Sequence, residues 1–225
     1  MIYTFLLLNL FLILIPFVLA LDHKVFSIAG LKTFLIPSLI VTFVFSEIGV
    51  FLTGLKAWNF NPNYLIGAYY RGFPLEGYLF LFSFCFAGLG IYTFLNNRYA
   101  KNDLQKYALT VSHLLIGICI AMLFFTYTKW YTAITFAFLM LLLIGVEYIN
   151  TLRFMYRFYR AYVACLIPFY ICYVIICNLP IISYDVKQNV GFSLARIPFE
   201  NHFFMMAMLL LGVYLMEVFK SRKKS

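Results

Sequence analysis

Charged residues are scarce in this sequence. Asp, Glu, Lys and Arg make up 11% of the 225 residues, whereas they make up about a quarter of a typical soluble domain. Hydrophobic residues account for 64%, and the mean hydropathy is +0.93. With so few charges the chain cannot cover its surface with groups that water solvates. A water-soluble fold is therefore excluded.

Residue clusters that bind metals or diphosphates are also missing. The three aspartates are isolated in predicted loops. This argues against a prenyltransferase, because that chemistry needs Asp-rich clusters to hold Mg²⁺ and diphosphate. No Cys-x-x-Cys pair occurs, and the cysteines lie in apolar stretches, where they are expected to be packing residues. No metal site or disulfide is expected at Cys85, Cys119, Cys165, Cys172 or Cys177.

Two further classes lack their key residues. A retinal photoreceptor needs a lysine in the middle of a helix, but the last apolar stretch holds none before Lys220. A flavin-using cyclase of the soluble type needs a Gly-x-Gly-x-x-Gly turn after a strand. The nearest match, Gly88-Leu89-Gly90, lies inside an apolar stretch and predicts a close contact between helices.

Long apolar stretches dominate what is present. A membrane span needs about 20 mostly apolar residues, because the hydrocarbon layer is about 30 Å thick and a helix rises about 1.5 Å per residue. The stretches are too long and too uniformly apolar for barrel strands. They predict an all-α integral membrane protein with seven transmembrane helices in a single membrane domain, residues 1–225. The predicted spans are Ile2–Leu21, Thr33–Leu52, Leu75–Leu95, Leu104–Phe125, Thr132–Ile149, Tyr162–Ile182 and Phe199–Phe219.

The net charge of +9 is explained by the side of the membrane on which the basic residues fall. The side that holds the loops after the first, third and fifth predicted spans and the C-terminal tail has twelve basic residues: Lys24, Lys32, Arg98, Lys101, Lys106, Arg153, Arg157, Arg160, Lys220, Arg222, Lys223 and Lys224. The other has five: Lys56, Arg71, Lys129, Lys187 and Arg196. The positive-inside rule then predicts a multi-pass protein of the cytoplasmic membrane, with the N-terminus outside and the C-terminus cytoplasmic. The lipid bilayer is the expected partner, and nucleic acid is not.

Two glutamates share one sequence context. Glu76 follows Arg71 and Pro74, and Glu200 follows Arg196 and Pro198, each in a Pro-x-Glu motif before an aromatic-rich span. An acid inside hydrocarbon must pair, stay protonated or face a cavity. Proline and an acid are also typical of the first turn of a helix, where the acid meets the positive end of the helix dipole. The motifs therefore indicate either two helix starts or a site.

The predicted topology favours a site. The third and seventh spans run in the same direction, so both Pro-x-Glu motifs lie at one membrane face and are expected to line one cavity. Glu47 is expected to face the same cavity, whereas Glu147 is expected to form a salt bridge with nearby arginines. The pattern also predicts two parallel three-helix repeats joined by a connecting helix, with halves at residues 1–97 and 98–225.

The loops extend this pattern into a family resemblance. The segment Lys56–Gly67 with Phe73–Glu76, and the segment Asn178–Asp185 with Asn189–Gly191 and Arg196–Glu200, resemble the two halves of the membrane lycopene cyclases of the heterodimeric or fused type. The resemblance covers about Ile36 to Glu217. It implies an intramolecular lyase that isomerises the acyclic end of a carotenoid to an ionone ring, without net redox change and without a cofactor. It also implies a lipophilic polyene substrate, and a homo-oligomer or carotenoid-pathway enzymes as partners.

The resemblance also suggests roles for individual residues. A carboxylic acid must protonate an alkene, aromatic faces and a carboxylate must stabilise the carbocation, and a base must then remove a ring proton. Glu76, Glu200 and Glu47 are the expected catalytic residues. The expected substrate-binding residues are Trp58, Phe60, Pro74, Arg196, Pro198, Asn201 and His202.

Two positions depart from the family pattern. The family carries a second acid after each motif, where this chain has Gly77 and Asn201. His202 is a candidate replacement for the lost partner of Glu200. The sequence therefore leaves two alternatives open: an active lycopene cyclase, or a divergent or non-catalytic protein that binds or transports an isoprenoid lipid.

Overall fold

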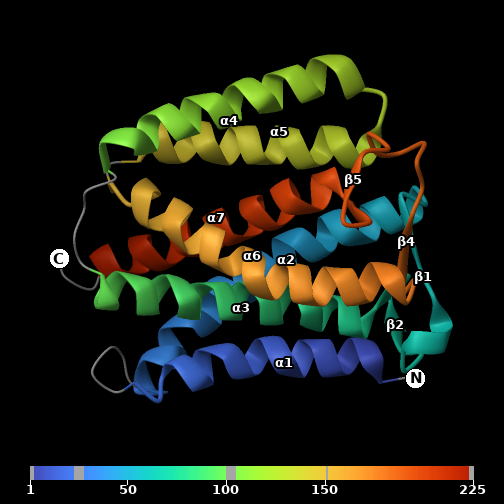
Figure 1. Ribbon diagram of the computed structural model, residues 1–225, viewed down its shortest axis with the longest axis horizontal. Helices are drawn as coiled ribbons and strands as arrows, with labels where there is room; N and C mark the ends of the chain where they lie inside the picture. Colours follow the sequence, from blue (N-terminus) through green and yellow to red (C-terminus); the bar gives the residue numbers. More distant parts are fainter. Residues whose placement is uncertain (1–2, 23–27, 100–104, 151, 223–225) are drawn as a thin grey trace.

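The computed structural model describes residues 3–22, 28–99, 105–150 and 152–222. Its helices run along one common direction and form one bundle (Figure 1). The last turns of the fifth helix are π-helical, at Gly145–Ile149. The helices are α1 (Thr4–Leu19), α2 (Lys32–Gly54), α3 (Leu75–Arg98), α4 (Gln105–Thr126), α5 (Trp130–Ile144), α6 (Met155–Asn178) and α7 (Phe199–Arg222), and a 3₁₀ turn, Ile28–Leu31, precedes α2.

Helices α3 and α7 form the core of the bundle, and glycines allow the close approach of their neighbours. A Cβ on Gly88 of α3 would lie 2.5 Å from a methyl carbon of Leu209 on α7. A Cβ on Gly90 would lie 2.6 Å from Pro16 of α1. The close helix contact predicted for Gly88 and Gly90 is therefore confirmed, and small residues set the spacing between helices, as is common in membrane bundles.

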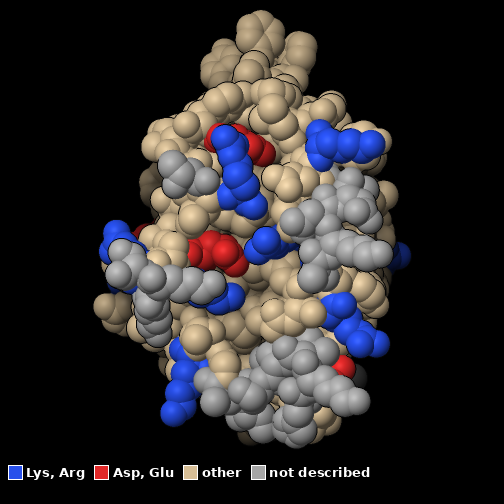
Figure 2. Space-filling model, turned by 90° about the vertical axis from the view of Figure 1, so that its left-hand side faces the viewer, with Lys and Arg blue, Asp and Glu red and all other residues tan. Residues whose placement is uncertain are grey.

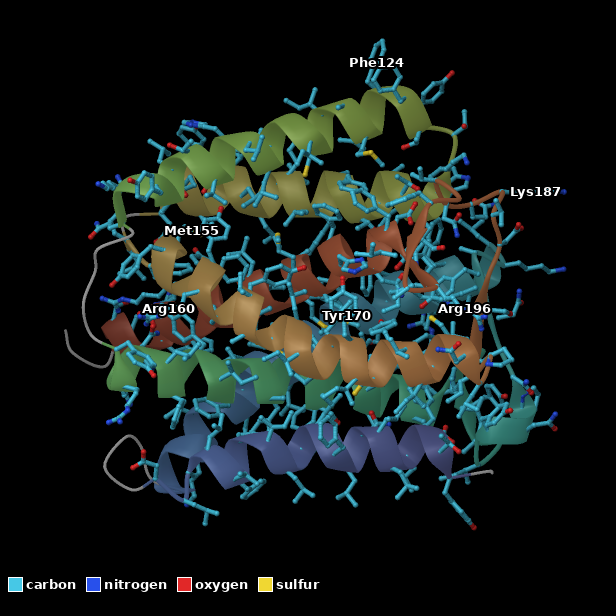
Figure 3. All side chains as sticks on the ribbon, in the orientation of Figure 1. Phe124, Met155, Arg160, Tyr170, Lys187 and Arg196 are labelled. Atoms are coloured by element: carbon cyan, nitrogen blue, oxygen red, sulfur yellow. The ribbon has the colours of Figure 1, made fainter. Side chains whose placement is uncertain are left out.

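The bundle has the surface expected in lipid. Large apolar side chains point outward, such as Phe124 of α4 (Figure 3) and Phe43 of α2. Among the described residues, six helices are long and apolar enough to cross a membrane, and α1 is shorter, with 16 residues. The all-α class is confirmed, and α1 as a seventh span stays a prediction.

The structure corrects the start of the sixth helix. Helix α6 begins at Met155 rather than at Tyr162, so Arg157 and Arg160 lie in its first turns instead of in a loop. Arg157 Nε donates to the hydroxyl of Tyr156 at 2.6 Å, and Arg160 donates to the carbonyl of Leu95 at 3.1 Å. A helix can hold arginines at the membrane edge when their head groups find such acceptors. The predicted span began too late because hydropathy treats every arginine as the end of an apolar stretch.

The expected salt bridge of Glu147 is wrong. Glu147 is buried and accepts a hydrogen bond from the hydroxyl of Ser112 on α4, and that hydroxyl lies 2.6 Å from the hydroxyl of Tyr159. No ion pair joins Glu147 to an arginine within the described parts of the chain. Glu147 lines the same pocket as Arg153, but its carboxyl is bound by the serine hydroxyl and not by an arginine.

Two loops meet at one end of the bundle, on the right of Figure 1. Strand β1 (Trp58–Phe60) pairs antiparallel with β4 (Ile182–Tyr184), so the α2–α3 loop contacts the α6–α7 loop. Each loop also forms a small hairpin. The first comprises β2 (Tyr69–Tyr70) and β3 (Phe73–Pro74), after a 3₁₀ turn at Pro62–Tyr64, and the second comprises β5 (Ser193–Leu194) and β6 (Ile197–Pro198).

The two loops have matching backbone patterns. Asn59 and Ser183, which pair with each other, are 124 residues apart. The same offset relates β2–β3 to β5–β6, and α3 to α7, residue for residue. The N–H of Asn61 donates to the carbonyl of Ile181, and the N–H of Asp185 donates to the carbonyl of Ala57. These two hydrogen bonds join equivalent atoms, so each loop holds the other in the same way.

Basic residues divide between the two ends of the bundle. Lys and Arg side chains are spread over the end shown in Figure 2. Arg160 lies at this end, whereas Lys187 and Arg196 lie at the opposite end (Figure 3). Lys32 at the start of α2, Arg98 at the end of α3 and Arg222 at the end of α7 belong to the larger group. Lys24, Lys101, Lys223 and Lys224 lie outside the described residues. The two ends therefore differ as the sequence indicated, and which end is cytoplasmic stays a prediction.

Candidate active site

Glu76 is buried at the start of α3, beneath the first loop. Its side chain is 3% exposed, and its Oε1 accepts the N–H of Ile66 at 2.5 Å. Asn9 of α1 donates to the backbone carbonyl of Glu76 at 3.1 Å. Pro74 caps the helix in an extended conformation just before its first residue. The glutamate therefore ties the loop and α1 to the helix start.

Glu200 has the same position in α7. It is fully buried, and its Oε1 accepts the N–H of Val190 at 2.6 Å and the hydroxyl of Thr132 on α5 at 2.6 Å. Pro198 is buried just before α7. Both glutamates thus accept a backbone N–H ten residues earlier in the chain.

Each of these carboxyl groups has one oxygen without a hydrogen-bond partner in the described part of the chain. Oε2 of Glu76 and Oε2 of Glu200 are buried and have no hydrogen-bond partner among the described residues. Buried polar atoms are usually paired, and exceptions often mark functional sites. The two Oε2 atoms are the places where this end of the bundle could exchange a proton with another molecule.

The residues after the two glutamates occupy different surroundings. Beside Gly77 lies the ring of Phe73, so close that a Cβ on Gly77 would be 2.6 Å from Cε1 of that ring. Asn201 is nearly fully buried and accepts the hydroxyl of Tyr131 at 2.5 Å through Oδ1. Its Nδ2 donates to the hydroxyl of Tyr184 at 2.7 Å. One position is thus filled by an aromatic ring and the other by a hydrogen-bonded amide.

An aromatic pocket of about 40 Å³ lies at the contact between the two loops. The rings of Trp58 and Tyr131 meet edge to face at 5.1 Å between centroids, and those of Trp58 and Phe204 meet at 6.0 Å. The indole N–H of Trp58 donates to Thr53 at 2.7 Å. The pocket is lined by Phe5, Trp58, Phe60, Phe73, Gly77, Phe80, Leu81, Tyr173, Ile182, Tyr184, Phe204 and Met205.

The two carboxyl groups flank this pocket without lining it. Gly77, the neighbour of Glu76, is a lining residue, and Tyr184, the partner of Asn201, is another. The carboxyl groups themselves turn toward the loop N–H groups that they bind. The structure therefore brings the two acids, Trp58 and Phe60 to one end of the bundle, with aromatic side chains between them.

Glu47 is not brought to the pocket. It forms an ion pair with Arg71, with 2.6 Å between Oε1 and Nη1, and its side chain is 43% exposed. The hydrogen bond and charge of Glu47 raise the pKa of the Arg71 guanidinium. An exposed pair of this kind contributes little to stability, and it places no carboxyl oxygen among the aromatic rings.

Arg196 and His202 also lie apart from the pocket lining. Arg196 is exposed, has a left-handed backbone (φ 66°), and donates to the side chain of Asn178 at 2.8 Å. His202 Nε2 lies 3.0 Å from the hydroxyl of Tyr170, and its ring packs on Phe169. His202 therefore has its own partners and does not contact Glu200 within the hydrogen-bonding network described here.

Sequence reasoning missed the hydroxyl groups around the second acid. Tyr131 and Thr132 lie in the first turn of α5, and Tyr184 lies in β4. Burial raises the pKa of the Tyr184 phenol well above its usual value, so this group stays a neutral hydroxyl. Tyr184 falls in a segment that carries the family resemblance, but no sequence spacing connects Tyr131 or Thr132 with Glu200.

Comparison with known proteins identifies the family. A sequence model described as lycopene cyclase matches residues 1–95 and 128–219. No curated protein and no solved structure gives a significant match. The match spans α1 to most of α3 and α5 to most of α7, including both loops and both buried acids. The chain therefore belongs to the lycopene cyclase family.

Proposed function

We propose that this protein is a carotenoid cyclase, which closes the acyclic end of a lycopene-like polyene to an ionone ring inside the membrane. The observation that carries the proposal is the pair of buried acids, Glu76 and Glu200, each with an unpartnered Oε2. They flank an aromatic pocket in a bundle of apolar helices. A polyene partitions into lipid, so a site within the bilayer meets its substrate directly.

The reaction is an isomerisation in which atoms and electrons balance. One acid gives the proton on Oε2 to the terminal alkene, and the resulting carbocation is attacked by a second double bond to close the six-membered ring. A base then removes a ring proton and restores a double bond. One proton is gained and one is lost, so no redox partner is needed. Aromatic faces such as those of Trp58 and Phe204 stabilise the positive charge and exclude water.

The pocket must widen to admit a substrate. Its volume of about 40 Å³ suits one or two small atoms, whereas sites for drug-sized ligands have roughly 300–1,000 Å³. Phe73 lines the pocket, and its ring fills the space beside Gly77, the neighbour of Glu76, so its displacement would extend the pocket toward that acid. We propose that rotation of Phe73 opens a path between the pocket and Glu76.

The same proposal includes a duplicated architecture. The constant offset between α3 and α7, and between the two hairpins, supports two equivalent halves. The family match leaves out residues 96–127, which include α4, the proposed connector. In this arrangement α1 also crosses the membrane, which makes seven spans in all. The N-terminus is then outside, and the basic end of the bundle is in the cytoplasm.

One specific observation favours a second function. The family positions for a second acid hold Gly77, covered by Phe73, and Asn201, held by two tyrosines. If those acids supply the essential proton, the same bundle would bind an isoprenoid lipid without cyclising it. The pairs Gly77–Phe73 and Asn201–Tyr184 would then be substitutes that keep the pocket packed.

Expression in lycopene-accumulating bacteria separates the two functions. A product of unchanged mass and blue-shifted absorption, absent from cells that express Glu200→Gln at equal membrane levels, would establish a self-sufficient cyclase. Unchanged lycopene beside a membrane-inserted wild-type protein would reject cyclisation of that substrate. Co-purification of lycopene with that inactive protein would then support the binding function.

A further inference from the structure

We propose that this protein binds an anionic phospholipid in a groove between α2 and α7, at the end of the bundle opposite the two loops. The groove has a volume of about 460 Å³. Its lining includes Lys32, Ile36 and Pro37 from the start of α2 and Phe219, Lys220 and Arg222 from the end of α7. It shares no lining residue with the aromatic pocket.

The charge of the groove favours an anionic ligand. Among the described residues that line it, three are cations and none is a carboxylate. The nearest acid in the sequence of α7, Glu217, accepts the hydroxyl of Tyr92 at 3.0 Å and lines an adjoining hollow. Lys220 lines both that hollow and the groove, whereas Lys32 and Arg222 line the groove alone. Lys220 and Arg222 lie in the last turn of α7, where they also offset the negative end of the helix dipole. A phosphate group would meet donors from both helices.

The equivalent junction, between α6 and α3, is closed by the chain itself. Under the offset of 124 residues, Ile36 corresponds to Arg160, and Phe219 corresponds to Leu95. Arg160 donates to the carbonyls of Leu95 and Tyr99 and to the side chain of Asn96 at 2.8 Å. Isoleucine has no donor to make such a closure. The α2–α7 junction therefore keeps a groove at the place where the α6–α3 junction has an arginine.

The apolar side of the groove continues along the outer face of α2. Ile36, Leu39 and Phe43 are spaced for one helix face, and they are 60%, 58% and 68% exposed. A ligand with a phosphate head and acyl chains could place the head among the cations and its chains on this stripe. Electrostatic attraction and apolar contact would then act together at a membrane edge. This combination selects an anionic glycerophospholipid over a free phosphate ion.

The test compares two double variants with the same charge change at the same end. Lys32→Gln with Arg222→Gln removes two groove cations. Arg98→Gln with Lys106→Gln is the control, and Arg98 is the counterpart of Arg222 at the closed junction. The full-length protein in neutral detergent is titrated with phosphatidylglycerol, and lipid binding is measured from the thermal stabilisation. Binding should weaken about tenfold or more in the groove variant and stay near the wild-type value in the control. Equal loss in both variants, or no loss in the groove variant, overturns the proposal.

A single substitution tests the groove independently. Ile36→Arg adds a positive charge but places an arginine where Arg160 stands in the second half. If the groove holds the lipid, Ile36→Arg should weaken phosphatidylglycerol binding despite the added charge. If general attraction to a basic surface is responsible, the same substitution should strengthen binding, which would contradict the proposal.

Two competitors establish the source of the phosphate. Inorganic phosphate at millimolar concentration should not displace phosphatidylglycerol, because it lacks acyl chains. Displacement by inorganic phosphate would identify a free-anion site, and stronger binding of farnesyl diphosphate than of phosphatidylglycerol would identify a diphosphate site. Either result overturns the lipid assignment. The experiment measures binding at the far end of the bundle, so it stands whether or not the protein cyclises a carotenoid.

Discussion

The ring of Phe73 lies against Gly77 at a distance that leaves no room for any side chain: a Cβ there would be 2.6 Å from Cε1 of the ring. Phe73 belongs to β3 and Gly77 to the first turn of α3, so the contact locks the hairpin onto the helix start. The glycine and the phenylalanine are complementary, and changing one should require a change in the other.

Gly77→Ala is therefore expected to destabilise the protein by about 1–3 kcal/mol, because an extra methyl group overpacks a filled site. Phe73→Leu should recover part of this loss in the double variant, since a smaller side chain makes room for the methyl. Thermal unfolding in detergent measures both effects. Gly117→Ala is the matched control, because a Cβ at that helical position has nothing within 4 Å among the described atoms. Equal destabilisation by Gly77→Ala and Gly117→Ala would contradict this interpretation.

Glu76→Gln and Glu200→Gln are each expected to reduce cyclisation by about 10²-fold or more, because an amide supplies no proton in place of general acid–base catalysis. Both variants should still insert into the membrane, since the amide oxygen can accept the same loop N–H group. Pigment chromatography from cells with equal protein levels measures the effect. Glu217→Gln, at the far end of α7, is the control and should retain activity. Full activity in Glu76→Gln or Glu200→Gln would remove that residue from the mechanism.

Tyr131→Phe is expected to cost about 1–3 kcal/mol of stability, because it leaves the buried Oδ1 of Asn201 without its donor. Tyr127→Phe provides the comparison, since Tyr127 is 74% exposed and the loss of its hydroxyl should change stability by less than about 0.5 kcal/mol. Thermal unfolding of the two variants under one condition measures the difference. No difference between them would mean that the Tyr131 hydroxyl contributes nothing to the packing of Asn201.

The proposed orientation predicts which end of the bundle an impermeant thiol reagent can reach in intact cells. A cysteine at Lys187→Cys should be labelled from outside, and one at Lys106→Cys should be labelled only after permeabilisation. The native cysteines lie within the helices, so wild-type protein supplies the background. The reverse labelling pattern would invert the topology and place the acidic pair on the cytoplasmic side.

The sequence predicted the helix starts at the two acids well because proline and glutamate are local signals. Leu75 and Phe199 begin α3 and α7, as expected. It also predicted the division of basic residues between two ends. These features depend on hydropathy and on the first turn of each helix, which a few neighbouring residues determine. The two acids were expected to line one cavity, whereas both are buried and neither lines the aromatic pocket.

Contacts between distant segments were not predictable in this way. Tyr131 reaches Asn201 across 70 residues, and Ser112 reaches Glu147 across 35 residues. No local sequence pattern predicts such partners, because each contact depends on how one helix is rotated relative to another. Glu147 illustrates the failure: nearby arginines suggested an ion pair, whereas the π-helical turn directs the carboxyl to a serine on another helix.

The pairing of β1 with β4 has a structural consequence of its own. Asn59 stands opposite Ser183, its own counterpart, with Trp58 opposite Tyr184 and Phe60 opposite Ile182 on either side. This is the register that two identical strands adopt across a two-fold axis, as in an isologous dimer. In the proposed duplicated architecture, the single chain corresponds to two subunits joined through the connecting helix α4. If the chain were divided within α4, the two separate polypeptides would each still carry one of the paired strands, β1 or β4. Their loops would therefore contain the surface through which the two halves associate.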